Sequence, residues 1–130
     1  MHNYYVSTWE QERYRRYIFP VICDSAMKNL AQIHPLRQKQ VDAVYRAMQG
    51  DPNVSMIVIF GSSLNLRCTI NSDLDLAVKL KDGHASNEIK TEIYEKIQDA
   101  CDWNADILWR DRLDESDRIL QDIRKGVILN

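Results

Sequence analysis

The stretch from residue 54 to residue 80 changes its spacing of hydrophobic and polar positions twice. Residues 54–60 form a mainly apolar, β-branched run, which predicts a buried strand. The run ends at Gly61-Ser62-Ser63, and a polar loop follows. From residue 72 to residue 80 apolar and polar residues alternate, which predicts a second strand. One face of this strand carries Leu74, Leu76, Val78 and Leu80, and the other carries Asp73, Asp75, Ala77 and Lys79.

Apolar positions three and four residues apart predict helices before and after these strands. The first helix begins at Pro35, which suits a first helical turn, and ends before Gly50. The second begins after Ser86, a residue type that caps helix N-termini. Residues 104–109 alternate again and predict a third strand.

The end of the chain predicts a last helix followed by an apolar tail. A cap at Asp114 or Ser116 would begin the helix, and Gly126 would follow its last residue. Residues 127–129 are apolar and are predicted to dock on the sheet. The alternation of helices and strands indicates an α/β or α+β fold, with helices packed on one sheet face and the acidic face left open.

Residues 1–34 precede this pattern and are predicted to form a helical extension, with residues 35–130 as the main domain. Ser7 or Thr8 would cap the extension, and Pro20 predicts two short helices or one bent one. Apolar positions with helical spacing are Trp9, Tyr14, Tyr17, Ile18, Val21 and Ile22. The default expectation is that this segment packs on its own domain. The alternatives are that it pairs two copies in a homodimer or holds a partner protein.

Composition narrows the classes of function. The chain has 130 residues, of which 45% are hydrophobic and 28% charged, as expected for one domain with a single core. A net charge of −2 argues against a general nucleic-acid binder. The three cysteines lack Cys-x-x-Cys spacing, so we predict neither a disulfide framework nor a zinc site and expect a reducing cytoplasm. No stretch is typical of a secretory leader or a membrane span.

The candidate functional residues lie at the two points where the hydrophobic pattern of residues 54–80 changes. Asp73 and Asp75 share a strand face and repel each other, and a divalent cation such as Mg²⁺ would resolve that conflict. The plainer alternative is a solvated strand start. Gly61 lets a ligand approach the backbone, and Ser62 offers a hydroxyl and an amide to a phosphate, although a simple turn would also explain both.

This motif resembles a known family. Gly61-Ser62, ten further residues and then Asp73-x-Asp75 match the signature of the DNA polymerase β-like nucleotidyltransferase superfamily, above all its minimal nucleotidyltransferases. The resemblance covers roughly Leu36 to the C-terminus and implies a mixed sheet. It also implies a third acid on a neighbouring strand. Asp106 matches that position, with Asp102 as its rival in the preceding connection.

The resemblance further implies a reaction. Asp73, Asp75 and Asp106 would bind two Mg²⁺ ions, while Gly61 and Ser62 would hold the terminal phosphates of a nucleoside triphosphate. Ser63 is a weaker candidate for the same task. The reaction would move a nucleoside monophosphate, AMP from ATP, to a hydroxyl and release pyrophosphate.

The loop after Gly61-Ser62 departs from the family pattern. Many minimal members have arginines and a glycine there, whereas this chain has residues 63–68, SLNLRC, with Arg67 at a different offset. The family implies an acceptor or partner of the small helical HEPN type. The alternative to an enzyme is a non-catalytic antitoxin or regulatory module that masks such a partner. A plain α/β domain with chance acids is the third interpretation.

Overall fold

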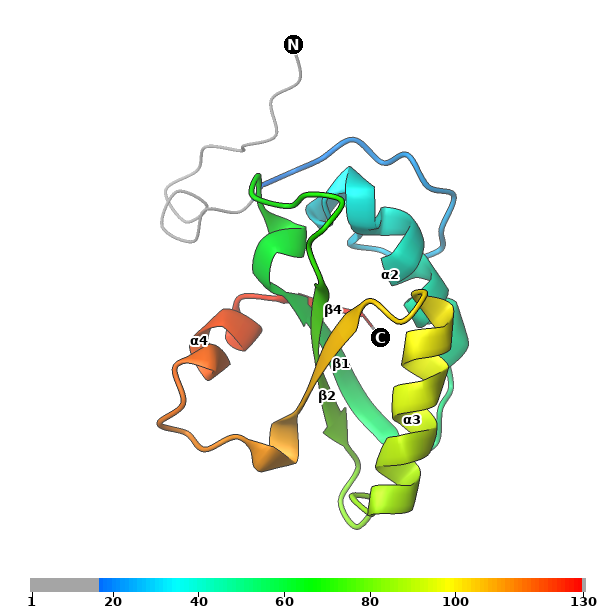
Figure 1. Ribbon diagram of the computed structural model, residues 1–130, viewed down its shortest axis with the longest axis vertical. Coiled ribbons are helices and arrows are strands. Elements are labelled where there is room, and N and C mark those ends of the chain that lie inside the picture. The colour runs from blue at the N-terminus through cyan, green and yellow to red at the C-terminus, as the bar shows by residue number, and fades with distance from the viewer. Residues whose placement is uncertain (1–16, 130) are drawn as a thin grey trace.

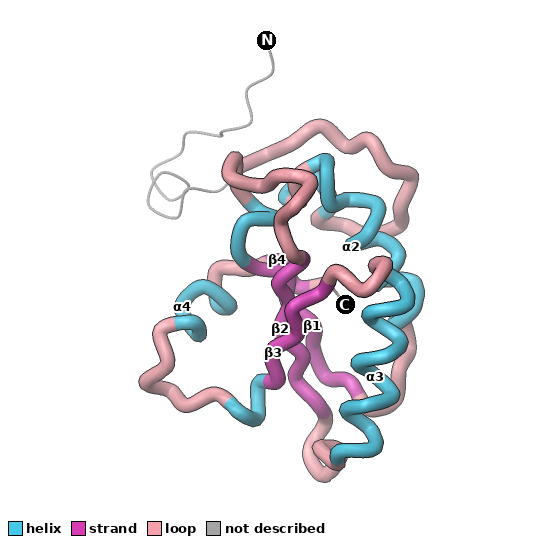
Figure 2. The backbone as a smooth tube through the Cα atoms, viewed as in Figure 1, coloured by secondary structure: helices cyan, strands magenta, loops and turns pink. Residues whose placement is uncertain are grey.

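The computed structural model describes residues 17–129, whose strands form one sheet with helices on both faces (Figure 1). The strands are β1 (Val54–Phe60), β2 (Leu74–Leu80), β3 (Ala105–Trp109) and β4 (Val127–Ile128), and the helices are α2 (Pro35–Met48), α3 (Asn87–Ala100) and α4 (Ile119–Arg124). Short 3₁₀ turns span Leu30–Gln32, Gly61–Leu64 and Arg110–Arg112. The strand order is β3-β2-β1-β4. Figure 2 shows the strands gathered between α4 on one side and α2 and α3 on the other. Strand β1 is antiparallel to β2 and β4, and β2 is parallel to β3, so the sheet is mixed, as the resemblance implied.

The core lies between the sheet and helices α2 and α3, which cover the same face (Figure 1). The alternation predicted for β2 is confirmed, because Leu74, Leu76 and Val78 are fully buried there. Strand β1 has the predicted bounds and contributes Ile57 and Ile59 to the same core. Burying these side chains is the main favourable term in folding.

Helix α4 packs against the opposite face of the sheet. Its Leu120 and Ile123 form a second buried cluster with Val58, Phe60 and Ala77 of strands β1 and β2. The face that carries the aspartates is therefore covered along part of its length and exposed at the end where β2 and β3 begin.

Two of the three helix starts predicted after residue 34 are confirmed. The Nδ1 atom of His34 accepts from the backbone N–H of Leu36 at the start of α2. Ser86 Oγ accepts from the N–H of Ile89 at the start of α3. These bonds satisfy amide groups that a helix leaves without partners in its first turn.

The predicted start of the last helix is wrong. Asp114 and Ser116 lie in a turn in which Ser116 N donates to Asp114 Oδ1 and Asp114 N donates to Asp117 Oδ2. These side chains bond locally instead of capping a helix, as short polar side chains often do. Helix α4 begins only at Ile119.

The apolar tail docks on the sheet as predicted and adds strand β4, which pairs with Val58 and Ile59 of β1. Gly126 precedes this strand in a confined place. A Cβ atom there would meet the Ile59 carbonyl oxygen and the Val58 side chain.

Neither the two short helices nor the single bent helix predicted before His34 forms in the described part of that segment, where the 3₁₀ turn Leu30–Gln32 is the only helical element. Pro20 has no N–H, its carbonyl accepts from Gln38 Nε2 at 2.8 Å, and Gln38 Oε1 accepts from Ile22 N at 2.8 Å. The buried Gln38 side chain thus satisfies backbone groups that a helix would have paired internally. The predicted caps Ser7 and Thr8 lie outside the described residues, and the division at residue 34 stays a prediction.

Two further expectations concern thiols and membranes. Cys23, Cys68 and Cys101 are all free thiols, in line with the absence of a disulfide framework. Within residues 17–129, no helix has both the length and the apolar character needed to cross a membrane.

Arg37, at the start of α2, holds the loop that leads into β2. It is only 4% exposed. Its Nη2 atom donates to the carbonyl oxygens of Thr69, at 2.8 Å, and Ser72, and its Nη1 atom donates to Gln40 Oε1 at 3.0 Å. A buried guanidinium depends on such bonds, because its desolvation is costly.

We predict that Arg37→Gln lowers the free energy of unfolding by about 3 kcal/mol, since each bond from a charged donor contributes roughly 1.5–3 kcal/mol. Urea denaturation would measure this. Lys39→Gln is the matched control, because Lys39 is an exposed cation of the same helix, and it should change stability by less than about 0.5 kcal/mol. Equal losses in the two variants would contradict the assigned role of Arg37.

Candidate active site

Three aspartates meet at the end of the sheet where β2 and β3 begin. Asp75 of β2 and Asp106 of β3 are direct register partners in the parallel pair. Asp73 stands two residues before Asp75 and shares its face by the strand period. Asp102, the rival candidate, lies in the turn after α3 and outside β3.

The carboxylates of Asp73 and Asp106 repel that of Asp75. The pKa of Asp75 is raised, first by burial and then by the negative charges of Asp106 and Asp73. Asp73 and Asp106 are exposed, and Asp75 is half-buried. No lysine or arginine among residues 17–129 forms a salt bridge with any of the three. The site therefore carries a local excess of negative charge.

Gly61 brings the backbone directly against this group. Phe60 is the register partner of Asp75, so the chain leaves β1 beside that carboxylate. Gly61 has φ +79°, and a Cβ atom at this position would lie 2.5 Å from Asp75 Oδ2. Both the left-handed backbone and the close approach require glycine here.

Gly61 also lines a cavity of about 430 Å³. Its wall includes the predicted residues Gly61 and Ser62 together with two cations, Arg67 and Lys125, and it also includes Asp122. Lysine and arginine side chains beside a Gly-Ser turn can donate charge-assisted hydrogen bonds to phosphate oxygens. The cavity and the aspartates thus share one glycine as their common boundary.

Ser63 and Lys125 have positions that the sequence pattern does not indicate. Ser63 does not line the cavity, because its side chain is fully buried, while its carbonyl accepts from His34 N at 2.7 Å. Lys125 lines the cavity although sequence reasoning did not select it. The sequence predicts that residues 127–129 dock on the sheet, but it does not place Lys125 in the cavity wall.

The donor set fits Mg²⁺. Among the residues that the structure describes, no three acidic, histidine or cysteine side chains converge into a metal site by themselves. Mg²⁺ is usually held by one or two carboxylates, with waters and substrate phosphates completing its shell. Asp73, Asp75 and Asp106 offer hard oxygen donors of this kind, and a cation would relieve their repulsion.

Solved structures with the same fold come from toxin–antitoxin pairs. A mutant of the toxin–antitoxin MntA-HpeT matches with TM-score 0.54 and 21% identity, covering 69% of this chain and 72% of that one. A toxin–antitoxin structure with AMP-PNP matches with TM-score 0.54 and 23% identity over the same shares. The tri-AMPylated Shewanella oneidensis HEPN toxin in complex with MNT antitoxin gives TM-score 0.52 and 22% identity, covering 72% and 71%.

Sequence comparison supplies the family. No curated protein sequence matches this chain significantly. The family model described as "Polymerase beta, Nucleotidyltransferase" matches residues 42–129, a range that contains the Gly61-Ser62 turn and all three aspartates. This agrees with the resemblance drawn from the motif, and the mixed sheet agrees with the fold. The chain therefore belongs to the polymerase beta nucleotidyltransferase family.

Proposed function

We propose that this protein transfers the AMP group of ATP to a hydroxyl group of a small helical HEPN-type partner, with Mg²⁺ as cofactor. The observation that carries the proposal is the position of Gly61, which lies against Asp75, the register partner of Asp106, and also lines a cavity with Arg67 and Lys125. Negative charges that attract a cation and positive charges that attract phosphate are what a metal-dependent nucleotidyl transfer requires.

The relatives support the choice of nucleotide and acceptor. One similar toxin–antitoxin structure contains AMP-PNP, and another contains a tri-AMPylated HEPN toxin in complex with its MNT antitoxin. By analogy, we take ATP as the donor and a HEPN-type protein as the acceptor for this chain. The free thiols suit the reducing cytoplasm in which we place the reaction.

The reaction joins the acceptor oxygen to the α-phosphorus of ATP and breaks the bond from that phosphorus to the departing pyrophosphate. Asp73, Asp75 and Asp106 would hold two Mg²⁺ ions, which supply charge neutralisation at the phosphates and favour deprotonation of the acceptor hydroxyl. We assign exposed Asp106 to the side from which the hydroxyl approaches.

The chain's own residues position the triphosphate. Gly61 leaves room for it to approach Asp75, and Ser62 can donate from its amide and hydroxyl. Arg67 and Lys125 would bind the departing pyrophosphate and stabilise the charge that it gains. These two cations would take the place of the arginines that many relatives have in the loop after Gly-Ser.

Calorimetric titration of ATP, with and without Mg²⁺, tests the proposal in wild type and in Asp73→Asn/Asp75→Asn. We expect Mg²⁺-dependent binding that the double variant loses. Transfer of labelled AMP should fall roughly 1,000-fold, because the charge stabilisation supported by these groups is worth several kcal/mol.

Asp82→Asn is the control for this test, because Asp82 is an exposed carboxylate in the turn after β2. Metal-linked binding without transfer to a HEPN-type acceptor would favour the masking module over the enzyme. ATP affinity that is the same with and without Mg²⁺, and the same in wild type and the double variant, would contradict the assignment of Asp73 and Asp75.

Gly61→Ala should lower transfer by about 100-fold, since displacing Asp75 by a fraction of an ångström to 1 Å spoils the alignment of the reacting groups. Gly83→Ala is a matched control. Gly83 has φ +80°, against +79° for Gly61, and a Cβ atom there would meet nothing within 4 Å. In each variant the same backbone strain should lower the free energy of unfolding by about 1–2 kcal/mol, so this strain does not distinguish the two. Equal activities in the two variants would show that contact with Asp75 is unimportant.

Asp75→Asn should raise the melting temperature of the metal-free protein at about pH 7. The raised pKa means that folding favours the protonated carboxyl. The protonated Asp75 carboxyl therefore stabilises the fold fully below the pKa that it has in the unfolded chain, near 3.9. This stabilisation is lost as pH rises through the higher pKa that it has in the folded protein. The gain from Asp75→Asn should shrink at about pH 4 and also on addition of Mg²⁺ to both proteins at pH 7. A gain that is the same under all three conditions would refute this explanation.

A further inference from the structure

Two neighbouring turns rim the aspartate end of the sheet. Residues 69–72 precede β2, and residues 101–104 precede β3. Asn104 joins them, because its Nδ2 atom donates to the Ser72 carbonyl at 3.2 Å and its own carbonyl accepts from Leu74 N at 2.9 Å. These bonds tie the two turns together at the end of the sheet that carries the aspartates.

Each turn exposes a large apolar side chain. Ile70 is 75% exposed and Trp103 is 59% exposed. Single exposed apolar residues are common on protein surfaces. These two, however, lie on hydrogen-bonded turns directly before the strands that carry Asp75 and Asp106.

Trp103 is held in place before any partner arrives. Its Nε1 atom donates to Asp99 Oδ1 at 3.0 Å, and its ring meets Tyr94 edge-on with 6.0 Å between the centroids. Asp102 and Trp103 both have left-handed φ angles, of +57° and +59°. A fixed aromatic side chain loses little conformational entropy on binding, which makes it an effective contact residue.

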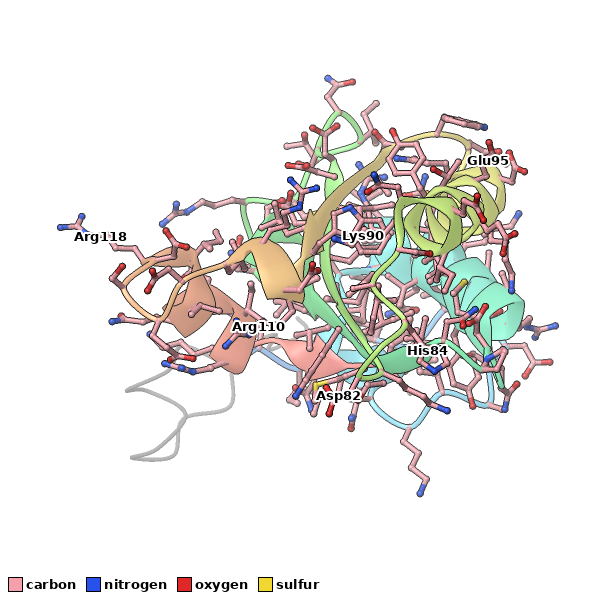
Figure 3. All side chains as sticks on the ribbon, turned by 90° about the horizontal axis from the view of Figure 1, so that it is seen from below. Asp82, His84, Lys90, Glu95, Arg110 and Arg118 are labelled. Carbon is pink, nitrogen blue, oxygen red and sulfur yellow. The ribbon has the colours of Figure 1, made fainter. Side chains whose placement is uncertain are left out.

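The charge around Trp103 is negative. Asp99 and Asp102 are exposed beside it, and the carboxylates continue along α3 through Glu95 and Glu92. In Figure 3, Glu95 points outward from α3. These acids follow one another at steps of three and four residues, a spacing at which like charges destabilise a helix.

The two lysines of α3 do not compensate this row of acids. Lys90 Nζ lies 2.7 Å from Asp111 Oδ2, and Lys96 Nζ lies 2.8 Å from Asp51 Oδ2. A partner with lysine or arginine side chains would supply the missing positive charge.

We infer that Ile70 and Trp103, with Asp99 and Asp102, form a docking surface for the acceptor protein, which binds through a helix that combines apolar and basic side chains. Identifying the docked protein as the acceptor depends on the proposed function. Docking here would place the acceptor beside Asp106, on the side we assign to its hydroxyl. The occupant is thus a basic, amphipathic protein surface.

The test uses the full chain and a synthetic amphipathic helix of about 18 residues, long enough to fold on contact, with leucine on one face and lysine flanking it. A second peptide, with glutamate in place of each lysine, is the control. We expect the lysine peptide to bind at least about tenfold more tightly than this control. Binding should weaken as salt is raised, because the attraction is screened.

Trp103→Ala and Ile70→Ser should each weaken binding of the lysine peptide by at least about tenfold. Ile128→Ser is the matched control, because Ile128 is 50% exposed on β4, at the far edge of the sheet. Equal binding of the two peptides, no binding of either, or equal effects of Ile70→Ser and Ile128→Ser would overturn the proposal.

Two further measurements separate this proposal from its alternatives. Sedimentation reports whether Trp103→Ala breaks up a dimer, in which case the occupant is a second copy and the proposal fails. Binding of Mg²⁺-ATP to Trp103→Ala should match wild type within about twofold, since the substitution leaves the nucleotide site intact. Failure of wild type to bind Mg²⁺-ATP would count against the proposed function, whereas the peptide measurements would still decide whether the surface binds a basic helix.

Discussion

The register between β2 and β3 is the constraint on which the site depends, because it holds carboxylates together that would otherwise separate. The β2–β3 register sets Asp75 beside Asp106, and the strand period keeps Asp73 on the same face. The same period buries Leu74 and Leu76 on the opposite face. A shift by one residue would expose the core and bury the acids, so the hydrophobic core fixes the register that maintains the repulsion.

The arrangement separates the two substrates of the proposed reaction. The cavity with Arg67 and Lys125 lies toward β1 and β4, whereas the surface of Ile70 and Trp103 lies before β2 and β3. A small domain can therefore receive a donor from one half of its sheet and an acceptor at the other.

Much of this architecture could be predicted from the sequence, because strand alternation and helix capping depend on nearby residues. The faces of β2 and the placement of Asp106 on β3 follow from a two-residue period. Contacts between distant segments could not be predicted in this way. The Gln38 side chain bonds to backbone groups of Pro20 and Ile22, in a segment where the sequence predicted a helix. Ser63 is buried within a 3₁₀ turn, and Lys125 lines the cavity beside strand β4.

Gly61 as a shared boundary implies thermodynamic linkage between the two ligands of the proposed site. A cation at Asp75 lowers the local negative charge that a triphosphate beyond Gly61 would meet, and the triphosphate in turn supplies oxygens that the cation lacks. Such coupling is reciprocal, so each ligand raises the affinity for the other by the same factor. A fall in the concentration of either ligand would then weaken the binding of the other.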